Sequence, residues 1–422
     1  MTTARPLSKP PSLAGAEWLA AAAVRRLFRE FAASGVEIRA VGGAVRDALL
    51  GRAVNDIDFA VSAPPEVVER VGVAAGFKVV PTGRGHGTLT LVVDGRPFEV
   101  TSLREDVATD GRHAVVRFGT DWVADAERRD FTINSLSVNG DGEVYDPLDA
   151  YADVVARRVR FIGDADRRIA EDRLRALRFF RFHAQIGEGT PDAEGLAATI
   201  RARHDLATLS AERVGQEVRK IVLAPRAAAT IEIMQDAGIL PLVFAGVSYL
   251  PAFSRLSVDI ASKDVQSGFT VRLAALACRI EEDVRRLTDR LRLANAERDE
   301  MSAALAFARD LPLRPGPEAL KLRLYRAGER IFRDGLLLAW SWRYPSATEG
   351  HDADWLERLS LPKRWSPPTF PLNGRDIVAS GVVSGPRVGE MLRQLEDLWI
   401  QRDFSPTAAD LRQELRRLAA PP

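Results

Sequence analysis

The sequence contains little cysteine and no long apolar run. Cys278 is the only cysteine among 422 residues, which excludes an intrachain disulfide framework and a cysteine zinc cluster. The chain has no run of 18 apolar residues, and its first residues, MTTARPLSKPPSLAG, lack the apolar core of a signal peptide. We therefore expect a protein of the reducing cytoplasm with no membrane association.

A large excess of charge of either sign is also missing. The chain has 59 lysine and arginine residues against 58 aspartate and glutamate residues, which gives a net charge of +1. A polyanionic partner would therefore have to be bound by a local basic surface rather than by the field of the whole protein. The length and the 46% hydrophobic content indicate a globular protein of several domains.

Short β-like runs occur only in the first third of the chain. VEIRAV, DIDFAV, FKVV, TLTLVV and FEVTSL alternate with helical patterns between residues 36 and 146, and DGRP predicts a hairpin turn between the last two runs. A helix is expected from about Glu17 to Ala33. From about residue 164 onward the pattern is helical, with breaks near residues 225, 312 and 365. The predicted fold class is α+β, a mixed sheet with helices followed by an all-helical region.

Two aspartates follow a glycine-led turn in the stretch AVGGAVRDALLGRAVNDIDFAV. In a strand, residues two apart point to the same face, so the carboxylates of Asp56 and Asp58 could share divalent cations. Oxygen ligands without cysteine or histidine favour Mg²⁺ or Mn²⁺. Glu99, in a run of similar strand character, could add a third carboxylate at the same edge. The alternatives are a solvated aspartate pair and an outward-facing glutamate.

The turn itself has two interpretations. Gly42 and Gly43, between a strand and a helix, would let backbone amides approach a phosphate, and the helix N-terminus favours the same negative charge. Arg46, one turn into the helix, could direct its guanidinium to that anion. The simpler interpretation is a tight turn in which Arg46 pairs with Asp47.

Further motifs follow in a fixed order. They are GRGHGTLTL (83–91), ERRDFTINSLSV (127–138), GEVYDPLDAYAD, EDRLRALRFFRF (171–182) and LSAERVGQEVRKIV (209–222). Together with the glycine and aspartate motifs they resemble the class II tRNA nucleotidyltransferases, the family of CCA-adding enzymes and bacterial poly(A) polymerases. LNGRDIVASGVVSGPRVGEML (372–392) resembles the tail of the same family. Arg173 stands where that family usually has proline, which should affect only the start of a helix.

The resemblance implies a division of the chain into five parts. These are a loose N-terminal tail (1–13), a nucleotidyltransferase head or palm domain (14–150), a helical neck that selects the nucleotide (151–225), a helical body (226–365) and a helical, tRNA-binding tail (366–422).

The resemblance also implies the residues of the site. Asp56 and Asp58 would hold the metals and, with Glu99, form the catalytic set. Asp130, Thr132 and Asn134 would brace the fold. The implied nucleotide-binding residues are Gly42, Gly43, Arg46, Arg129, Asp172, Arg175, Arg178 and Arg181.

Four of these residues recur at every third position from Asp172 to Arg181, which on a helix would place them along one ridge. Cytosine and adenine each present an amino donor beside a ring-nitrogen acceptor, whereas guanine and uracil present the reverse order. The carboxylate of Asp172 beside the guanidinium of Arg175 would therefore accept C and A and reject G and U. The family is understood to select CTP and ATP in this way. Arg178 and Arg181 would hold phosphate or brace that pair; the alternative is a basic helix face against solvent.

The expected reaction is attack of an RNA 3′-hydroxyl on the α-phosphate of a nucleotide, with release of pyrophosphate by a two-metal mechanism. The leading hypothesis is addition of CMP, CMP and AMP to tRNA, whose acceptor and TΨC stem the helical region would bind. No obligate protein partner is evident. Residues 104–122 resemble the flexible loop with which CCA-adding enzymes switch from C to A. The alternatives are a poly(A) polymerase, an A-adding tRNA nucleotidyltransferase and an inactive RNA-binding scaffold.

Five histidines do not supply the ligands of the HD phosphohydrolase domain that some family members carry, so no phosphohydrolase activity is expected. His86 is expected to be structural. His351 or Asp352, in the lone HD pair, is expected to cap a helix.

Overall fold

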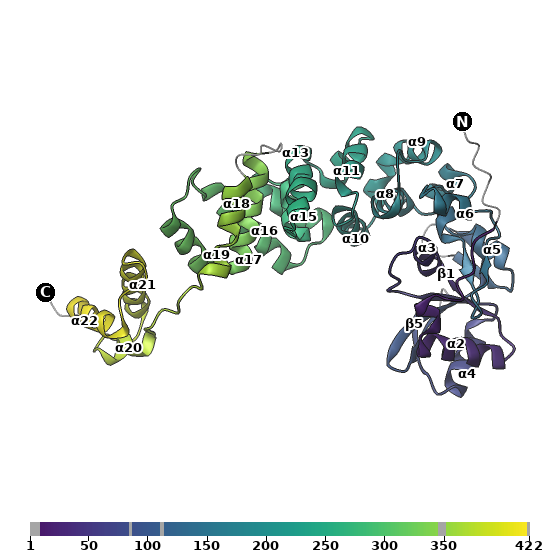
Figure 1. Cartoon of the computed structure of the whole chain (residues 1–422), viewed down its shortest axis with the longest axis horizontal. Coiled ribbons are helices and arrows are strands. Elements are labelled where there is room, and N and C mark those ends of the chain that lie inside the picture. Colours follow the sequence, from purple (N-terminus) through teal and green to yellow (C-terminus); the bar gives the residue numbers. More distant parts are fainter. Residues whose placement is uncertain (1–8, 84–86, 110–113, 345–351, 420–422) are drawn as a thin grey trace. The chain divides into compact units, whose positions relative to one another are not determined.

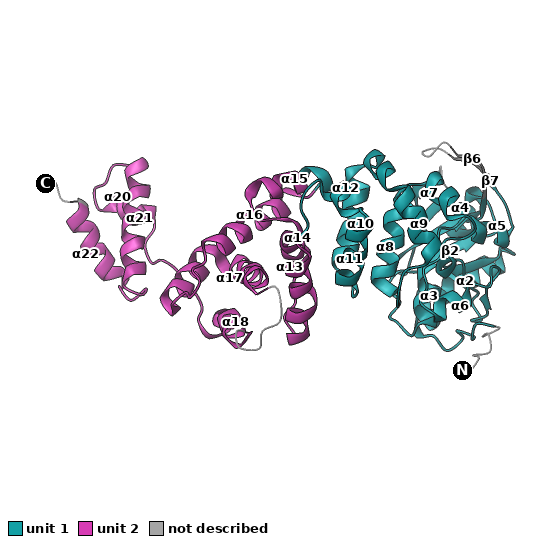
Figure 2. Ribbon diagram, turned by 90° about the horizontal axis from the view of Figure 1, so that it is seen from above, with its two compact units in different colours: residues 1–248, 289–292 teal, residues 249–288, 293–422 magenta. Residues whose placement is uncertain are grey.

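The computed structural model describes residues 9–83, 87–109, 114–344 and 352–419 (Figure 1). The chain forms two compact units, residues 1–248 with 289–292 and residues 249–288 with 293–422, which Figure 2 colours teal and magenta. Within the described ranges, no helix combines the length and the apolar character needed to cross a membrane. His86 and His351 lie outside the described residues.

The first unit is built on a mixed sheet, which has seven strands among the described residues, in the order β3-β4-β5-β2-β1-β8-β9. The strands are β1 (Ile38–Val41), β2 (Asp58–Val61), β3 (Lys78–Gly83), β4 (Thr88–Val93), β5 (Arg96–Ser102), β8 (Ser137–Val138) and β9 (Val144–Tyr145). Strands β2 and β5 run parallel, and the other neighbours run antiparallel. The predicted α+β class with an N-terminal mixed sheet is therefore confirmed.

One face of the sheet is buried and the other is partly open. Leu89, Leu91 and Val100 point to the buried face, which α2 (Ala22–Ala33) and α4 (Pro65–Ala74) contact. Alternation along each strand sends the intervening threonines and Glu99 to the opposite face, where they are exposed or half-buried. The predicted DGRP hairpin joins β4 to β5, and both Asp94 and Gly95 have positive φ, as tight hairpin turns require.

The remaining elements of the first unit are mostly helices. They are α1 (Glu17–Ala20), α3 (Gly43–Leu49), α5 (Trp122–Glu127), η2 (Thr132–Asn134), α6 (Tyr151–Val155), α7 (Ala165–Glu171), α8 (Leu174–Ile186), α9 (Ala193–Arg201), η3 (Arg203–Thr208), α10 (Ala211–Val222), α11 (Ala227–Asp236) and α12 (Leu240–Phe244). The single helix expected from Glu17 to Ala33 is wrong: Ala21 takes an extended conformation and begins α2 as its N-cap residue.

Strands also form in the segment that resembles a flexible loop. β6 (Arg104–Thr109) pairs with β7 (Ala114–Phe118) in a separate antiparallel hairpin. The β-branched residues of AVVRF and EDVAT favour such pairing. Whether this hairpin switches specificity from C to A stays a prediction.

The second unit is helical in its described residues. Its elements are α13 (Leu250–Ser254), η4 (Arg255–Ile260), η5 (Ala261–Lys263), α14 (Phe269–Ala277), α15 (Glu281–Leu291), α16 (Asn295–Asp310), α17 (Pro317–Arg343), α18 (Asp352–Leu359), α19 (Leu361–Arg364), α20 (Gly374–Ala379), α21 (Pro386–Gln401) and α22 (Ala408–Ala419). The last three residues of α15 belong to the first unit. Asp352 is the first residue of α18, where it pairs with the fully buried Arg255 and with Lys263.

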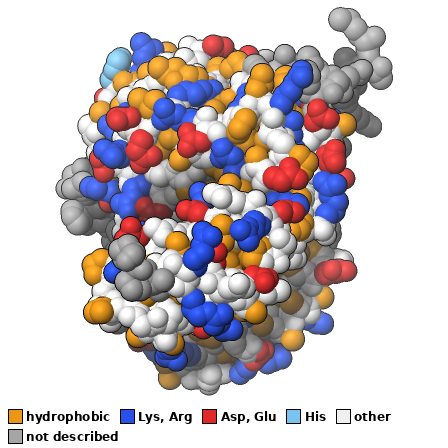
Figure 3. Space-filling view, turned by 90° about the vertical axis from the view of Figure 1, so that its left-hand side faces the viewer, with side chains coloured by type: hydrophobic (Ala, Val, Ile, Leu, Met, Phe, Trp, Pro, Cys, Tyr) orange, Lys and Arg blue, Asp and Glu red, His pale blue; other side chains and the backbone are white. Residues whose placement is uncertain are grey.

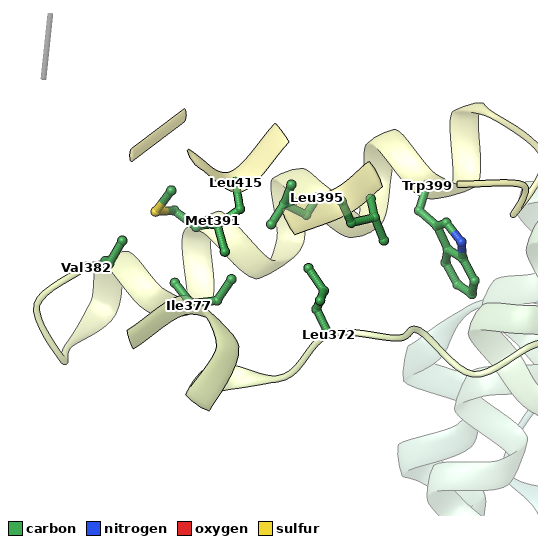
Figure 4. Close-up of a cluster of buried hydrophobic side chains, with 8 residues drawn as sticks. Leu372, Ile377, Val382, Met391, Leu395, Trp399 and Leu415 are labelled. Carbon is green, nitrogen blue, oxygen red and sulfur yellow. The ribbon is translucent and has the colours of Figure 1, made fainter. Parts of the chain in front are cut away.

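The last three helices share a hydrophobic core, against which Tyr325 of α17 also packs. Leu395 and Trp399 of α21 lie among side chains from α20, α22 and the preceding segment (Figure 4). The Trp399 indole donates a hydrogen bond of 3.1 Å to the Pro406 carbonyl.

On the face that Figure 3 shows, basic and acidic side chains are intermixed with hydrophobic ones. The predicted limits of neck, body and tail stay predictions.

Candidate functional site

Asp58 occupies the middle of a row of side chains that crosses the sheet. Strand pairing places Val41 of β1 on one side of Asp58 and Glu99 of β5 on the other. Residues paired in register point to the same face, so Asp58 and Glu99 lie side by side. Asp56 precedes β2 in irregular backbone instead of lying in the strand, because pairing with β1 begins only at Asp58.

Burial and charges of both signs act on Asp58. The pKa of its carboxyl is raised above the ordinary value of 3.8, first because the surrounding protein displaces part of its water, and then because Glu99 and Asp56 add like charge. Arg129 opposes this shift. Glu99 and Asp56 are therefore both close enough to Asp58 to act on its charge.

A glycine turn bordered by two guanidinium groups lies beside Asp58. Gly42 directly follows β1, has φ of +67° and ψ of −121°, and is the N-cap residue of α3. A Cβ atom on Gly42 would lie 3.4 Å from Nη1 of Arg129, and one on Gly43 would lie 3.6 Å from Nη2 of Arg46. Gly42 is buried and its amide donates to the Leu136 carbonyl at 3.2 Å, so the half-buried Gly43 is the accessible part of the turn, next to the two guanidinium groups.

Arg46 is held firmly in place by its neighbours. Its guanidinium donates to both carboxylate oxygens of Asp47 at 3.0 Å and to Oδ1 of Asn134 at 2.8 Å, and the residue is buried. The pairing with Asp47 that the simpler interpretation predicted is therefore present. Because Arg46 also lies next to Gly43, it places a positive charge beside the turn.

Arg129 is oriented by an acidic residue one helical turn earlier. Asp125 of α5 accepts hydrogen bonds from Arg129, at 2.9 Å from Nη2, and from Arg128. Burial alone would raise the pKa of Asp125, but these two guanidinium groups lower it below its ordinary value. Asp125 therefore stays ionised and fixes Arg129 against Gly42.

The residues expected to brace the fold form a buried polar network. Asp130 accepts hydrogen bonds from Arg178 at 2.7 Å and from the Asn134 amide at 3.1 Å. Burial would raise the pKa of Asp130, but Arg178 and these hydrogen bonds keep it lowered. Thr132 donates to Asp153 at 2.8 Å. The network connects the glycine turn, through Asn134, to helix α8.

The predicted ridge on one helix is wrong at its first residue. Helix α7 ends at Glu171, Asp172 is extended with φ of −151° and ψ of 105°, and α8 begins at Leu174 with Arg173 as its N-cap residue. Arg175, Arg178 and Arg181 do share α8. The missing proline at position 173 therefore does not prevent the helix from restarting there.

Each charged residue of this region has an acidic or basic partner. Asp172 accepts a hydrogen bond of 2.7 Å from Arg213 of α10, and Arg175 pairs with Glu171 at 2.6 Å. Arg181 pairs with Glu217 at 2.6 Å. Sequence reasoning missed Glu171, Asp125, Arg213 and Glu217 as partners. The i,i+4 spacing of Glu171 with Arg175, and of Asp125 with Arg129, could have revealed the first two.

Comparison with known proteins identifies the family. Residues 38–160 match the model of the poly A polymerase head domain, and residues 190–250 match that of the probable RNA and SrmB-binding site of polymerase A. The mitochondrial CCA tRNA nucleotidyltransferase 1 of Homo sapiens is 36% identical over 86% of this chain and 82% of its own length. The chain belongs to the CCA-adding enzyme and poly(A) polymerase family of nucleotidyltransferases.

Bacterial members of the family are similar over the same extent. The CCA-adding enzyme of Geobacillus kaustophilus is 31% identical over 87% of this chain and 89% of its own length. The crystal structure of the Bacillus stearothermophilus CCA-adding enzyme in complex with CTP has a TM-score of 0.71 and 25% identity, covering 94% of this chain and 96% of that one. A Thermotoga maritima CCA-adding enzyme complexed with tRNA shares the fold, with a TM-score of 0.63 and 19% identity over 94% of each chain.

The residues present suit the divalent metal that this family of nucleotidyltransferases implies. Among the described side chains, no three His, Cys, Asp or Glu residues converge as a ready-made metal cluster. Asp58 nevertheless has Glu99 paired beside it and Asp56 close enough to raise its pKa. Repulsion among carboxylates is relieved by a cation, and carboxylate oxygens are ligands that Mg²⁺ and Mn²⁺ accept.

Proposed function

We propose that this protein is a CCA-adding tRNA nucleotidyltransferase that transfers CMP, CMP and AMP from CTP and ATP to the 3′ end of tRNA. The observation that supports the reaction best is the position of Asp58, which lies between the Gly42–Gly43 turn on one side and Glu99 on the other. This arrangement combines a site for the leaving phosphates with a site for the attacking hydroxyl.

In the proposed mechanism, Asp56 and Asp58 would hold the divalent metal, with Glu99 as a further candidate ligand. A metal bound there supplies charge stabilisation for the phosphoryl transfer and favours ionisation of the attacking hydroxyl. The amide of Gly43 and the guanidinium of Arg129 would bind the triphosphate, whereas the Gly42 amide already donates to the Leu136 carbonyl. Arg46, held by Asp47 and Asn134, would position the turn.

Selection of C and A is assigned to the neck. Asp172 would accept a hydrogen bond from the amino group of cytosine or adenine, and Arg175 would donate to the ring nitrogen. Arg213 and Glu171 hold these two side chains and would orient them. Because Arg178 and Arg181 are engaged by Asp130 and Glu217, we propose that they act as supports for the neck rather than as phosphate ligands.

The proposal is tested by supplying the protein with Mg²⁺, labelled CTP or ATP, and tRNAs that end before C, before CC or before CCA is complete. Ordered addition of C, C and A that then stops is the expected result. Unlimited addition of A would identify a poly(A) polymerase, and addition of A alone an A-adding enzyme. No incorporation would favour an inactive RNA-binding scaffold.

Two variants show whether the measured nucleotide transfer comes from this protein or from a contaminating enzyme. Asp56→Ala and Asp58→Ala should each lower transfer by at least about a hundredfold while leaving the fold intact. Asp141→Ala, in the exposed turn between β8 and β9, is the matched control. The cytoplasmic location stays a prediction, since the human relative is named as a mitochondrial enzyme.

A further inference from the structure

The exposed face of strands β3, β4 and β5 carries two pairs of hydrogen-bonded threonines beside the carboxylates. The hydroxyl oxygens of Thr82 and Thr90 are 2.8 Å apart, and those of Thr88 and Thr101 are 3.0 Å apart. Thr90 is paired in register with Glu99, which is itself paired with Asp58. The row from Asp58 therefore continues over Glu99 to Thr90.

Distances across the sheet follow from its spacing. Neighbouring strands lie about 4.8 Å apart, so Thr90 stands about 10 Å from Asp58, on the side away from the glycine turn. Thr101 lies two residues after Glu99 on β5 and points to the same face. All four threonines are exposed or half-buried.

The order of the glycine turn, the carboxylates and the threonines across the sheet indicates which part of the substrate lies over strands β4 and β5. In phosphoryl transfer the attacking and leaving oxygens lie roughly in line on opposite sides of the phosphorus. In the proposed function the pyrophosphate leaves toward the Gly42–Gly43 turn, next to β1, so the attacking hydroxyl would approach across Asp58 of β2 from the side of β5. The chain that carries this hydroxyl then continues over β5 and β4.

We infer that the threonine pairs Thr82–Thr90 and Thr88–Thr101 bind the sugar-phosphate backbone of the last nucleotides of the RNA primer. This inference rests on the proposed function, because it takes the attacking group to be an RNA 3′ end. The four threonines are positioning residues that set the approach of the 3′-hydroxyl to the α-phosphate.

The chemistry of a hydroxyl pair suits this role. Each hydroxyl has one proton, so within a pair one hydroxyl donates and the other keeps its proton for a different acceptor. A phosphate oxygen or a ribose oxygen is such an acceptor. A lysine or arginine at these positions would instead pair with Glu99 or Asp58 and compete with the metal. Neutral donors therefore bind the backbone without disturbing the carboxylates.

The experiment compares Thr90→Val and Thr101→Val with the wild type in steady-state addition of AMP to tRNA ending in CC. Valine keeps the shape and the strand preference of threonine but removes the hydroxyl. We expect the KM for tRNA to rise about threefold to tenfold, the loss of one neutral hydrogen bond, with the KM for ATP unchanged. Thr90→Ser should restore the wild-type value.

Ser34→Ala, which removes an exposed hydroxyl at the C-cap of α2, is the control and should change neither constant. A tRNA with a 2′-deoxy terminal nucleotide distinguishes the two acceptors. If Thr90 contacts the ribose hydroxyl, the KM of Thr90→Val is the same for the deoxy and the normal tRNA. If Thr90 contacts a phosphate, the KM of Thr90→Val exceeds that of the wild type by the same factor on both tRNAs. Both results support the inference. Equal KM values for tRNA in wild type and both valine variants would overturn it. If the wild type itself adds nothing to tRNA, the proposed function fails instead.

Discussion

Asp334 of α17 and Glu300 of α16 are joined by a hydrogen bond between their carboxyl groups. Burial, this hydrogen bond and the charge of Glu300 together raise the pKa of Asp334 to about 7, while Arg330 and Arg333 act in the opposite direction. Glu300 is also paired with Arg330 at 2.6 Å. A protonated Asp334 thus belongs to the packing of these two helices near neutral pH.

The pair predicts a loss of stability as the pH rises. Since the pKa of Asp334 in the fold exceeds its ordinary value of 3.8, the folded protein binds more protons than the unfolded chain between about pH 4 and pH 7. The stabilisation is complete below this range and is lost on rising through it. Asp334→Asn should therefore raise the melting temperature by a few degrees at pH 7.5 relative to the wild type, with little gain at pH 5. Glu329→Gln, on an exposed part of α17, should show no such pH dependence.

Asp130 predicts the opposite pH dependence. Its pKa is lowered in the fold, so the stability that it contributes is present above about pH 4 and is lost as the pH falls further. Asp130→Asn leaves the charge of Arg178 without its partner and should destabilise the first unit by about 2–3 kcal/mol at pH 7. Thermal denaturation measures this loss. Asp166→Asn breaks an exposed pair with Arg201 and should lower the stability far less. An equal loss of stability in the two variants would show that burial does not make the Asp130 pair more important.

Gly42→Ala is predicted to weaken nucleotide binding. The alanine would be strained at φ of +67°, and its Cβ would stand in van der Waals contact, 3.4 Å, with Nη1 of Arg129 and so occupy space beside that guanidinium. We expect the KM for CTP to rise at least about tenfold. Gly51 also has a positive φ, but a Cβ there meets no atom within 4 Å. Gly51→Ala therefore carries backbone strain without the contact, and it should leave the KM for CTP near the wild-type value.

Asp172→Asn tests the assignment of base selection. An asparagine can turn its amide to donate where the carboxylate could only accept, so discrimination against UTP should fall. We expect incorporation of UMP relative to CMP to increase by at least about tenfold in competition assays. The specificity of Asp166→Asn, a loss of charge on the neighbouring helix α7, should be unchanged. An unaltered UMP to CMP ratio in Asp172→Asn would place base selection elsewhere.

The sequence predicted the local elements of the head better than their pairing. Alternating β-branched residues indicated the strands, and Asp94-Gly95 indicated the hairpin, because these signals lie within a few residues. The parallel pairing of β2 with β5 joins segments about forty residues apart, so the contact of Asp58 with Glu99 depended on tertiary structure. No spacing rule could have placed Thr90 in the same row.

In the neck, helical periodicity misled the prediction at one point. The recurrence from Asp172 to Arg181 fits a continuous helix, but Asp172 leaves the helix and its carboxylate accepts from the backbone amide of Leu174 at 3.1 Å. Aspartate readily makes such local bonds to the backbone in place of helical ones. Its distant partner Arg213 could not be inferred from spacing, since it belongs to another helix.

The hydrogen bonds from Arg46 to Asn134, from Asn134 to Asp130 and from Arg178 to Asp130 form an unbroken chain from the glycine turn to α8. These three bonds fix the distance between the part of the site that would hold phosphates and the helix that carries Arg175. If the turn and Arg175 bind the two ends of a nucleotide as proposed, the chain would fix the distance that the nucleotide has to span. A shift of α8 along its axis would therefore strain these hydrogen bonds and displace the Gly42–Gly43 turn.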